Sequence, residues 1–224
     1  MAQRVSQKLD RSVDTTVHRD VDKDATATSS GMRKDTLIAL ACSTGGPQAL
    51  QVLIPMLPAD LPVPLVLVQH MPAGFTELYA SRLNEQCELE VREAQSGDIV
   101  RPGLVLLAPG GDQHLELIRQ DNMYKIVLKK APKVNGHCPS VDVLFSSVAK
   151  HAKENAMGVI LTGMGGDGAK GLLEMRKNGS HTIGQDETTC IVYGMPKVAY
   201  EIGAVEYQEK LPDIAKRIYN VLNK

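Results

Sequence analysis

The stretch Thr36–Pro47, TLIALACSTGGP, limits what this chain can fold into more than any other part of the sequence. The apolar run Leu37–Ala41 stops at a series of small residues, and an amphipathic pattern begins at Pro47. Small residues between a strand and a helix predict a tight turn, and proline is well tolerated at the first helical position. We therefore expect Ser43 at the carboxyl end of a buried strand, beside a helix N-terminus that offers free N–H donors.

The same alternation of apolar runs and helical patterns continues along the chain. Val63–Val68 and Met157–Thr162 are further continuous apolar runs, each followed by a helical pattern. Strands of this kind predict a parallel sheet that is covered by helices on both faces. His114–Ile118 and Tyr124–Leu128 predict a β-hairpin. The expected fold is α/β: a doubly wound, mostly parallel sheet with helices on both faces and an antiparallel hairpin at one edge.

Residues 1–35 have a different composition from residues 36–224. Asp, Lys, Arg, Ser and Thr dominate there, and no aromatic residue occurs. Such a segment buries too little apolar surface to offset its loss of entropy on ordering. Apolar residues recur at every fourth position from Val5 to Val21, which leaves open a helix that docks on a partner. The interpretation is a solvated or docking tail followed by one domain over residues 36–224.

Composition excludes several classes of function. The net charge is −1 and Trp is absent, so neither nucleic acid nor an anionic membrane is an expected partner. No apolar run reaches the roughly 20 residues of a membrane span, and the N-terminus lacks the apolar core of a signal peptide. The four cysteines form no CxxC pair, which favours reduced thiols and a cytoplasmic location.

Three polar residues follow the three strongest apolar runs: Ser43, His70 and Asp167. The carboxyl ends of parallel strands lie at one edge of a sheet, so these residues should converge. A histidine can remove the proton of a serine hydroxyl at neutral pH, and a carboxylate fixes the histidine tautomer. The glycine-rich stretches at Gly45-Gly46 and Gly165 could supply N–H donors for an oxyanion. Each residue also has a plainer interpretation, with Ser43 as a turn residue and Asp167 as the N-cap of the following helix.

The segment Gly163-x-Gly165-x-x-Gly168 supports a rival hypothesis, because it matches the dinucleotide-binding fingerprint in spacing. It follows a strand, opens a helix, and has Asp186 and Glu187 about 20 residues further on. Against it, Asp167 places a carboxylate in the loop where a pyrophosphate should bind. A zinc site of His114, His137, Cys138 and Asp142 is a weaker hypothesis, since no ligand spacing recurs. Cys42 should face the opposite side of the strand from Ser43, as a small buried apolar residue.

Several motifs resemble the catalytic domain of the CheB-type chemotaxis protein-glutamate methylesterases. They cover nearly all of the chain from Leu37 onward: Ser43-Thr44-Gly45-Gly46, Gln69-His70-Met71-Pro72, Pro139–Phe145, Val159–Gly165, Asp167-Gly168 and Gly194-Met195-Pro196. The resemblance implies a doubly wound α/β fold and a serine hydrolase with the triad Ser43, His70 and Asp167. It also implies that Thr44 and Met164 lie near the oxyanion and the substrate. Ser140 is expected to cap the helix that begins in the Pro139–Phe145 motif.

The implied substrate is the methyl ester of glutamate on the cytoplasmic helices of methyl-accepting chemotaxis receptors, with methanol released. Deamidation of receptor glutamine is a further implied activity, and no metal or organic cofactor is expected. The family's receiver domain does not fit within a 35-residue tail, so the expectation is either constitutive activity or regulation in trans. Gly136 and Cys138 stand where the family usually has arginines, and the Pro109–His114 loop is one residue longer than usual. The alternative is a nucleotide-binding or receptor-binding module without turnover.

Overall fold

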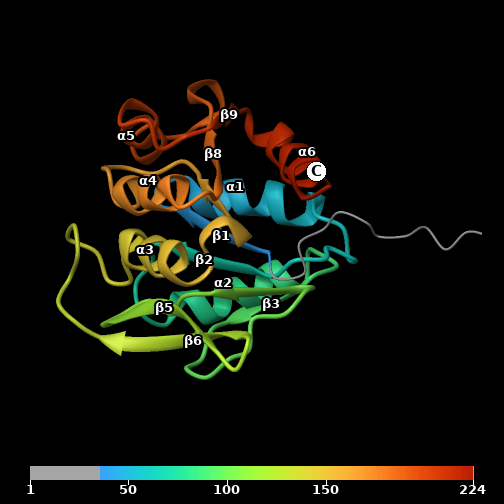
Figure 1. Cartoon of the computed structure of the whole chain (residues 1–224), viewed down its shortest axis with the longest axis vertical. Coiled ribbons are helices and arrows are strands. Elements are labelled where there is room, and N and C mark those ends of the chain that lie inside the picture. The colour runs from blue at the N-terminus through green and yellow to red at the C-terminus, as the bar shows by residue number, and fades with distance from the viewer. Residues whose placement is uncertain (1–35, 224) are drawn as a thin grey trace, which may run out of the picture. The chain divides into compact units, whose positions relative to one another are not determined.

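The apolar runs form neighbouring strands of one sheet in the structure, a computed structural model that describes residues 36–223 (Figure 1). The predicted tail and its four-residue repeat lie outside the described residues. The sheet has seven strands in the order β3-β4-β2-β1-β7-β8-β9, and every pair in it is parallel. Its strands are β1 (Leu37–Cys42), β2 (Leu65–Gln69), β3 (Glu90–Glu93), β4 (Leu104–Leu107), β7 (Ala156–Ile160), β8 (His181–Gln185) and β9 (Tyr207–Glu209).

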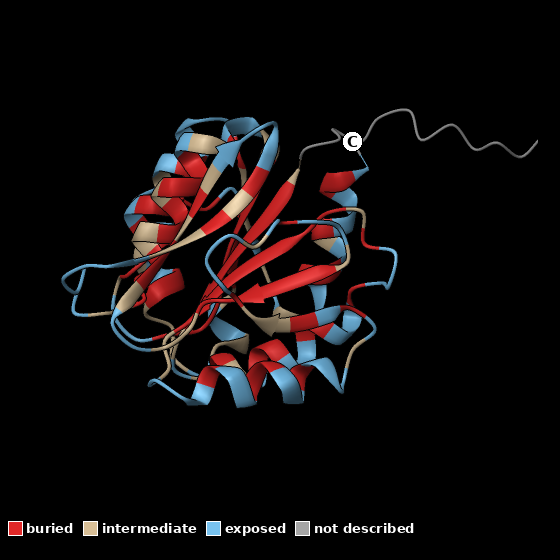
Figure 2. Ribbon diagram, turned by 90° about the horizontal axis from the view of Figure 1, so that it is seen from below, coloured by how far each residue is buried: buried red, intermediate tan, exposed pale blue. Residues whose placement is uncertain are grey.

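Helices cover both faces of this sheet, as predicted. Alternate residues of β1 point to opposite faces: Leu37, Ala39 and Ala41 pack on one, and Ile38, Leu40 and Cys42 on the other. The first face is covered by α3 (Val141–His151), α4 (Ala169–Lys177) and α5 (Met195–Glu201). The second is covered by α1 (Gly46–Leu53), α2 (Phe75–Asn84) and α6 (Leu211–Leu222). Figure 2 shows the consequence, with the central strands buried along their length.

Short 3₁₀ turns extend several of these helices or connect the strands. They lie at Ile54–Met56, Lys153–Asn155 and Glu187–Thr189. The amphipathic pattern that begins at Pro47 is α-helical only to Leu53, because the chain then tightens into the 3₁₀ turn that contains Pro55. No helix within residues 36–223 combines the length and the apolar character that crossing a bilayer requires.

The predicted hairpin is present as β5 (Gln113–Gln120) and β6 (Met123–Lys130). Asp121 and Asn122 form its two-residue turn with φ angles of 51° and 60°. The hairpin forms its own two-stranded sheet and does not lengthen the main one. It packs on α3, where the Leu117 N–H donates to Ser147 Oγ at 2.9 Å. The sequence predicts a hairpin at one edge of the sheet. In the structure its position is set by packing on α3 and not by pairing with a strand of the main sheet.

Candidate active site

The register of β1 and β2 brings Ser43 and His70 together. Cys42 pairs with Gln69, and the His70 N–H donates to the Cys42 carbonyl at 3.2 Å. Ser43 and His70 are therefore the next residues on two neighbouring strands, which lie about 4.8 Å apart in a sheet. The buried Gln69 side chain joins them, because its Nε2 donates to Ser43 O at 3.1 Å and to His70 O at 2.9 Å.

A second set of hydrogen bonds ties the Ser43 turn to the loop after β7. The Ser43 N–H donates to Thr162 O at 3.0 Å, and Thr162 Oγ1 bonds to Thr44 O at 3.0 Å. Gly45 has a φ of +81°, and a Cβ there would lie 2.6 Å from Ile191 Cβ. The Gly46 N–H donates to Ser43 O at 2.8 Å. Gly46 therefore closes the turn, so it has no free donor for an oxyanion.

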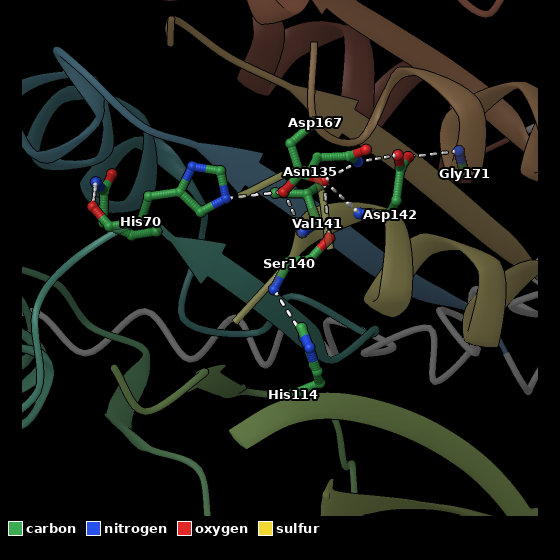
Figure 3. Close-up of polar contacts among 9 residues, drawn as sticks. His70, His114, Asn135, Ser140, Val141, Asp142, Asp167 and Gly171 are labelled. Atoms are coloured by element: carbon green, nitrogen blue, oxygen red, sulfur yellow. Dashed lines mark hydrogen bonds and ion pairs between the residues drawn. The ribbon is translucent and has the colours of Figure 1, made fainter. Parts of the chain in front are cut away.

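His70 is held by Asp167, although the two residues are 97 positions apart in the sequence (Figure 3). His70 Nε2 lies 2.9 Å from Asp167 Oδ2, and the side chains are 8% and 1% exposed. Since an ionised carboxylate only accepts hydrogen bonds, Nε2 carries the proton and Nδ1 keeps its lone pair. Nδ1 is buried and has no hydrogen-bond partner among residues 36–223. His70 therefore has one nitrogen fixed by Asp167 and one available as a base.

Asp167 also accepts hydrogen bonds from the start of α3. The Val141 N–H donates to Oδ2 at 2.7 Å; the Asp142 N–H and Ser140 Oγ donate to Oδ1 at 3.3 and 2.8 Å. Burial alone would raise the pKa of Asp167, but the hydrogen bonds from His70, Asn135, Val141 and Ser140 outweigh it and hold the pKa well below the usual range. The carboxylate is therefore ionised at neutral pH.

Both capping predictions around this carboxylate need correction. Ser140 occupies the N-cap position of α3, but its side chain makes no capping bond and donates to Asp167. The hypothesis that Asp167 caps its own following helix is wrong, since α4 begins after Gly168 without a side-chain cap. The cause is the turn at Gly168, whose φ of +92° sends the chain into α4 while Asp167 remains against α3. Asp167 thus caps a helix distant in sequence.

The sequence analysis missed Asn135 as a residue of this site and considered His137 only as a zinc ligand. Asn135 Nδ2 donates to Asp167 Oδ1 at 2.8 Å and to Asp142 Oδ2 at 2.6 Å. The His137 ring stacks face to face on His70, with centroids 3.8 Å apart and planes 5° from parallel. Burial lowers the pKa of His137, and repulsion from His70 when that ring is protonated lowers it further. The Asn135-Gly136 dipeptide is a turn signal that could have marked this segment.

A cleft of about 310 Å³ opens beside His70. Its walls are the segment after β2, the loop before β5 and the turn before α3; they comprise His70–Ala73, Gly111, Lys133 and Gly136–Pro139. The Gly110 N–H donates to Thr76 Oγ1 at 3.0 Å, which holds the Pro109–His114 loop against α2. Lys133 is the one lysine or arginine among the residues that line the cleft. The side chains that line this cleft therefore include a lysine and no carboxylate.

The backbone beside Ser43 offers further donors on the side of Gly163. A Cβ on Gly163 would lie 2.9 Å from Ser43 Cβ, so the loop after β7 contacts the serine directly. Within residues 36–223, the N–H groups of Thr44 and Met164 donate to no other protein group. The Met164 side chain is 71% exposed, and Gly165 has a φ of +86° with open space around it. Free donors and accessible surface therefore meet at this point.

The structure argues against the competing sites. Gly163 lies against Met195, and a Cβ on Gly168 would overlap Val141, so both glycines make room for protein side chains. His114 Nδ1 accepts the Ser140 N–H at 3.1 Å and its Nε2 bonds to Pro132 O at 3.0 Å, so both of its ring nitrogens are occupied. Cys42 is buried on the opposite face, as predicted, and burial raises its thiol pKa far above the usual range. These contacts therefore favour neither a nucleotide at the glycine-rich loop, nor zinc at His114, nor Cys42 as a nucleophile.

Comparison with known proteins shows the family to which this chain belongs. A family model described as CheB methylesterase matches residues 38–218. The chain belongs to the CheB methylesterase family. The crystal structure of the Thermotoga maritima CheB methylesterase catalytic domain superposes with a TM-score of 0.82 at 40% identity, covering 84% of this chain and 100% of that one. The match to a CheB catalytic domain confirms the expected family and the fold class.

Two relatives carry the name protein-glutamate methylesterase/protein-glutamine glutaminase. Those of Syntrophomonas wolfei and Sulfurimonas denitrificans are each 54% identical to this chain over 188 residues, which is 84% of its length. The alignments cover 54% and 53% of these relatives, so the chain spans about half of their length.

Proposed function

We propose that this domain hydrolyses glutamate methyl esters on the cytoplasmic helices of methyl-accepting chemotaxis receptors. The observation that carries the proposal is the arrangement of Ser43, His70 and Asp167. The serine and the histidine follow register-paired strands, and the carboxylate fixes one ring nitrogen of His70 and leaves the other as a base. Membership of the CheB methylesterase family and the names of the relatives support the substrate.

In the proposed reaction, Ser43 Oγ attacks the carbonyl carbon of the γ-ester while His70 Nδ1 takes its proton. The imidazolium that forms is stabilised by Asp167, and it then gives the proton to the departing methoxide. Methanol leaves, and Ser43 remains acylated by the glutamyl side chain. Water then attacks the acyl group with His70 again as base, which releases glutamate and restores the serine hydroxyl.

The oxyanion of each tetrahedral intermediate needs donors beside Ser43. We assign this role to the N–H groups of Thr44 and Met164, which are free of protein partners within residues 36–223 and belong to the two loops that meet at the serine. Donors fixed by the fold need little reorganisation during the reaction, and losing one such donor typically costs about 10²–10³-fold in kcat. Gly45 and Gly165 act indirectly, because they let these turns approach the reacting atoms.

The same residues fit deamidation of receptor glutamine, a second activity that the names of the relatives favour. The leaving group is then ammonia in place of methanol, and His70 delivers the same proton. The cytoplasmic location follows from the position of these receptor helices in the cell. Control by a receiver domain or another regulator in trans stays a prediction, as does the assignment of residues 36–224 to one catalytic domain.

The test is release of methanol from methylated receptor membranes by the wild type and by Ser43→Ala. We expect the wild type alone to release methanol, with both proteins showing the same cooperative melting. Release by Ser43→Ala near the wild-type rate would refute the nucleophile. A tight receptor complex without methanol release from either protein would favour the module that binds receptors without turnover. Ammonia release from receptors that carry glutamine tests the second activity in the same samples.

A further inference from the structure

The segment Lys133–Pro139 forms a tight turn that contacts two of the proposed catalytic residues, His70 and Asp167. The Val134 N–H donates to His137 O at 3.0 Å, and the His137 N–H donates to Val134 O at 2.9 Å. Between them, Asn135 and Gly136 have φ angles of 53° and 83°. Two central residues with positive φ are typical of the two-residue turns that close hairpins without strain. Asn135 and His137 are therefore held at a fixed distance from each other.

One arm of this turn holds the carboxylate. The Asn135 side-chain nitrogen donates to Asp167 Oδ1 at 2.8 Å and to Asp142 Oδ2 at 2.6 Å, so both of its hydrogens are used. Asp142 is itself fixed, because its Oδ1 accepts the Gly171 N–H of α4 at 2.8 Å. Figure 3 shows Asn135 between the two carboxylates. This arm therefore links Asp167 to the ends of two helices.

The other arm holds the imidazole. With centroids 3.8 Å apart and planes 5° from parallel, the His137 ring covers one face of His70. The hydrogen bond to Asp167 fixes the position of Nε2, but rotation about that bond would still change the direction in which Nδ1 points. A flat ring packed on the face of His70 opposes this rotation. The charged or titratable groups nearest His137 are His70, Asp167, Lys133 and Cys138.

We propose that His137 is a positioning residue that keeps His70 Nδ1 aimed at Ser43, with Asn135 performing the matching task for Asp167. This inference rests on the proposed function, because it assigns Nδ1 the role of base. An uncharged His137 suits the task, since a second cation on the face of His70 would oppose formation of the imidazolium. Burial lowers the pKa of His137, in agreement with a neutral ring at neutral pH.

The test uses the rate at which a small fluorophosphonate labels Ser43, because this reaction needs the base but no receptor. Labelling is measured at pH 8 over a range of probe concentrations, which separates the maximal rate constant kinact from the binding constant KI. The variants are His137→Phe, which keeps a flat neutral ring, and His137→Ala, which removes it. His151→Ala is the control, since His151 lies at the end of α3 and lines a different cleft.

We expect His137→Ala to lower kinact about 3- to 10-fold with KI unchanged, the range for loss of one aromatic stack. His137→Phe should restore kinact to within about 2-fold of wild type, and His151→Ala should match wild type. Equal kinact for Ala, Phe and wild type would overturn the positioning role. So would a change confined to KI, which would make His137 a binding residue.

A second variant tests the other arm. Asn135→Gly keeps the positive φ and removes the amide, and we expect it to lower kinact with KI unchanged; an unchanged kinact would overturn the role of Asn135. Failure of the proposed function has a different signature. A wild type that is not labelled at Ser43 would refute the triad and the positioning role together. A wild type that is labelled but releases no methanol from receptors would refute only the substrate.

Discussion

Replacing Asp167 by asparagine tests whether one carboxylate both organises the site and stabilises the fold. The aspartate accepts five hydrogen bonds, two on Oδ2 and three on Oδ1. Asparagine has nearly the same shape, but one of its two terminal atoms is a donor. With the amide nitrogen in place of Oδ2, it would face two donors, His70 Nε2 and the Val141 N–H. The opposite orientation would set the nitrogen against three donors. In the first orientation the Val141 N–H loses its acceptor, and His70 Nε2 can bond to the amide only after giving up its own proton.

Each of these bonds involves an ionised acceptor in a buried setting, where a bond contributes about 1.5–3 kcal/mol. Losing the bond to Val141 lowers the free energy of unfolding by about 1.5–3 kcal/mol, and replacing the charged bond to His70 by a neutral one lowers it further, before the relief from no longer burying a charge is counted. The effect on turnover has a separate cause. An amide donor opposite Nε2 favours the His70 tautomer with its proton on Nδ1, and such a ring cannot accept the Ser43 proton. A wrong tautomer of this kind costs about 10⁴-fold in kcat.

The assay pairs urea unfolding with methanol release and fluorophosphonate labelling of the same preparation. Asp142→Asn is the matched control: Asp142 contacts Asn135 and the Gly171 N–H but not His70, so turnover should stay within about tenfold of wild type. If Asp167→Asn kept turnover within tenfold while folded, the carboxylate would not set the tautomer. If it unfolded at the same urea concentration as wild type, the bonds to α3 would not stabilise the fold.

The remaining predictions concern acid, backbone conformation and the buried thiol. Folding lowers the pKa of Asp167, so the stabilisation from its ionised form is complete above the unfolded pKa of about 3.9 and is lost as the pH falls through the lowered pKa. The difference in free energy of unfolding between wild type and Asp167→Asn should therefore shrink below about pH 4. Urea unfolding at several pH values measures it. Gly168→Ala should destabilise the protein more than Gly74→Ala: both positions have positive φ, which costs a side chain about 1–2 kcal/mol, but only the new Cβ at 168 meets Val141. Equal urea midpoints for the two would contradict this. Cys42→Ala should keep turnover at the wild-type level, and native Cys42 should resist thiol reagents at pH 8 because burial raises its pKa; a large loss of turnover would reopen the question of the nucleophile.

The positions of Ser43, His70 and the main strands were predictable because they depend on simple periodicity. Continuous apolar runs identify buried parallel strands, and the carboxyl ends of such strands share an edge. The strand β9 was missed, since Tyr207–Glu209 is short and half exposed and carries no apolar run. The hairpin was found from its pattern, but its packing on α3 depends on which helix face remains uncovered, and that is a tertiary property.

The parts of the site that were not predicted also depend on tertiary contacts. Asn135 and His137 lie in an irregular segment, where no period in the sequence reports the direction of a side chain. The plainer interpretation of Asp167 placed it at the N-cap of the helix that follows it, since capping rules describe neighbours in sequence. Its actual contacts are with the start of α3, 25 to 27 residues earlier. Only the folded chain brings that helix to the loop after β7.

The bonds around Ser43 have a consequence for how long the site persists. Its N–H is bound to Thr162 O, and its carbonyl accepts from both Gly46 and Gln69. These partners belong to three different segments of the domain, so the serine turn opens only when the central strands separate. Amide hydrogen exchange at Ser43 should therefore proceed through global unfolding, as it does for core strands. The lifetime of the formed site is then the lifetime of the fold, and a ligand that reaches Ser43 meets a serine already in place.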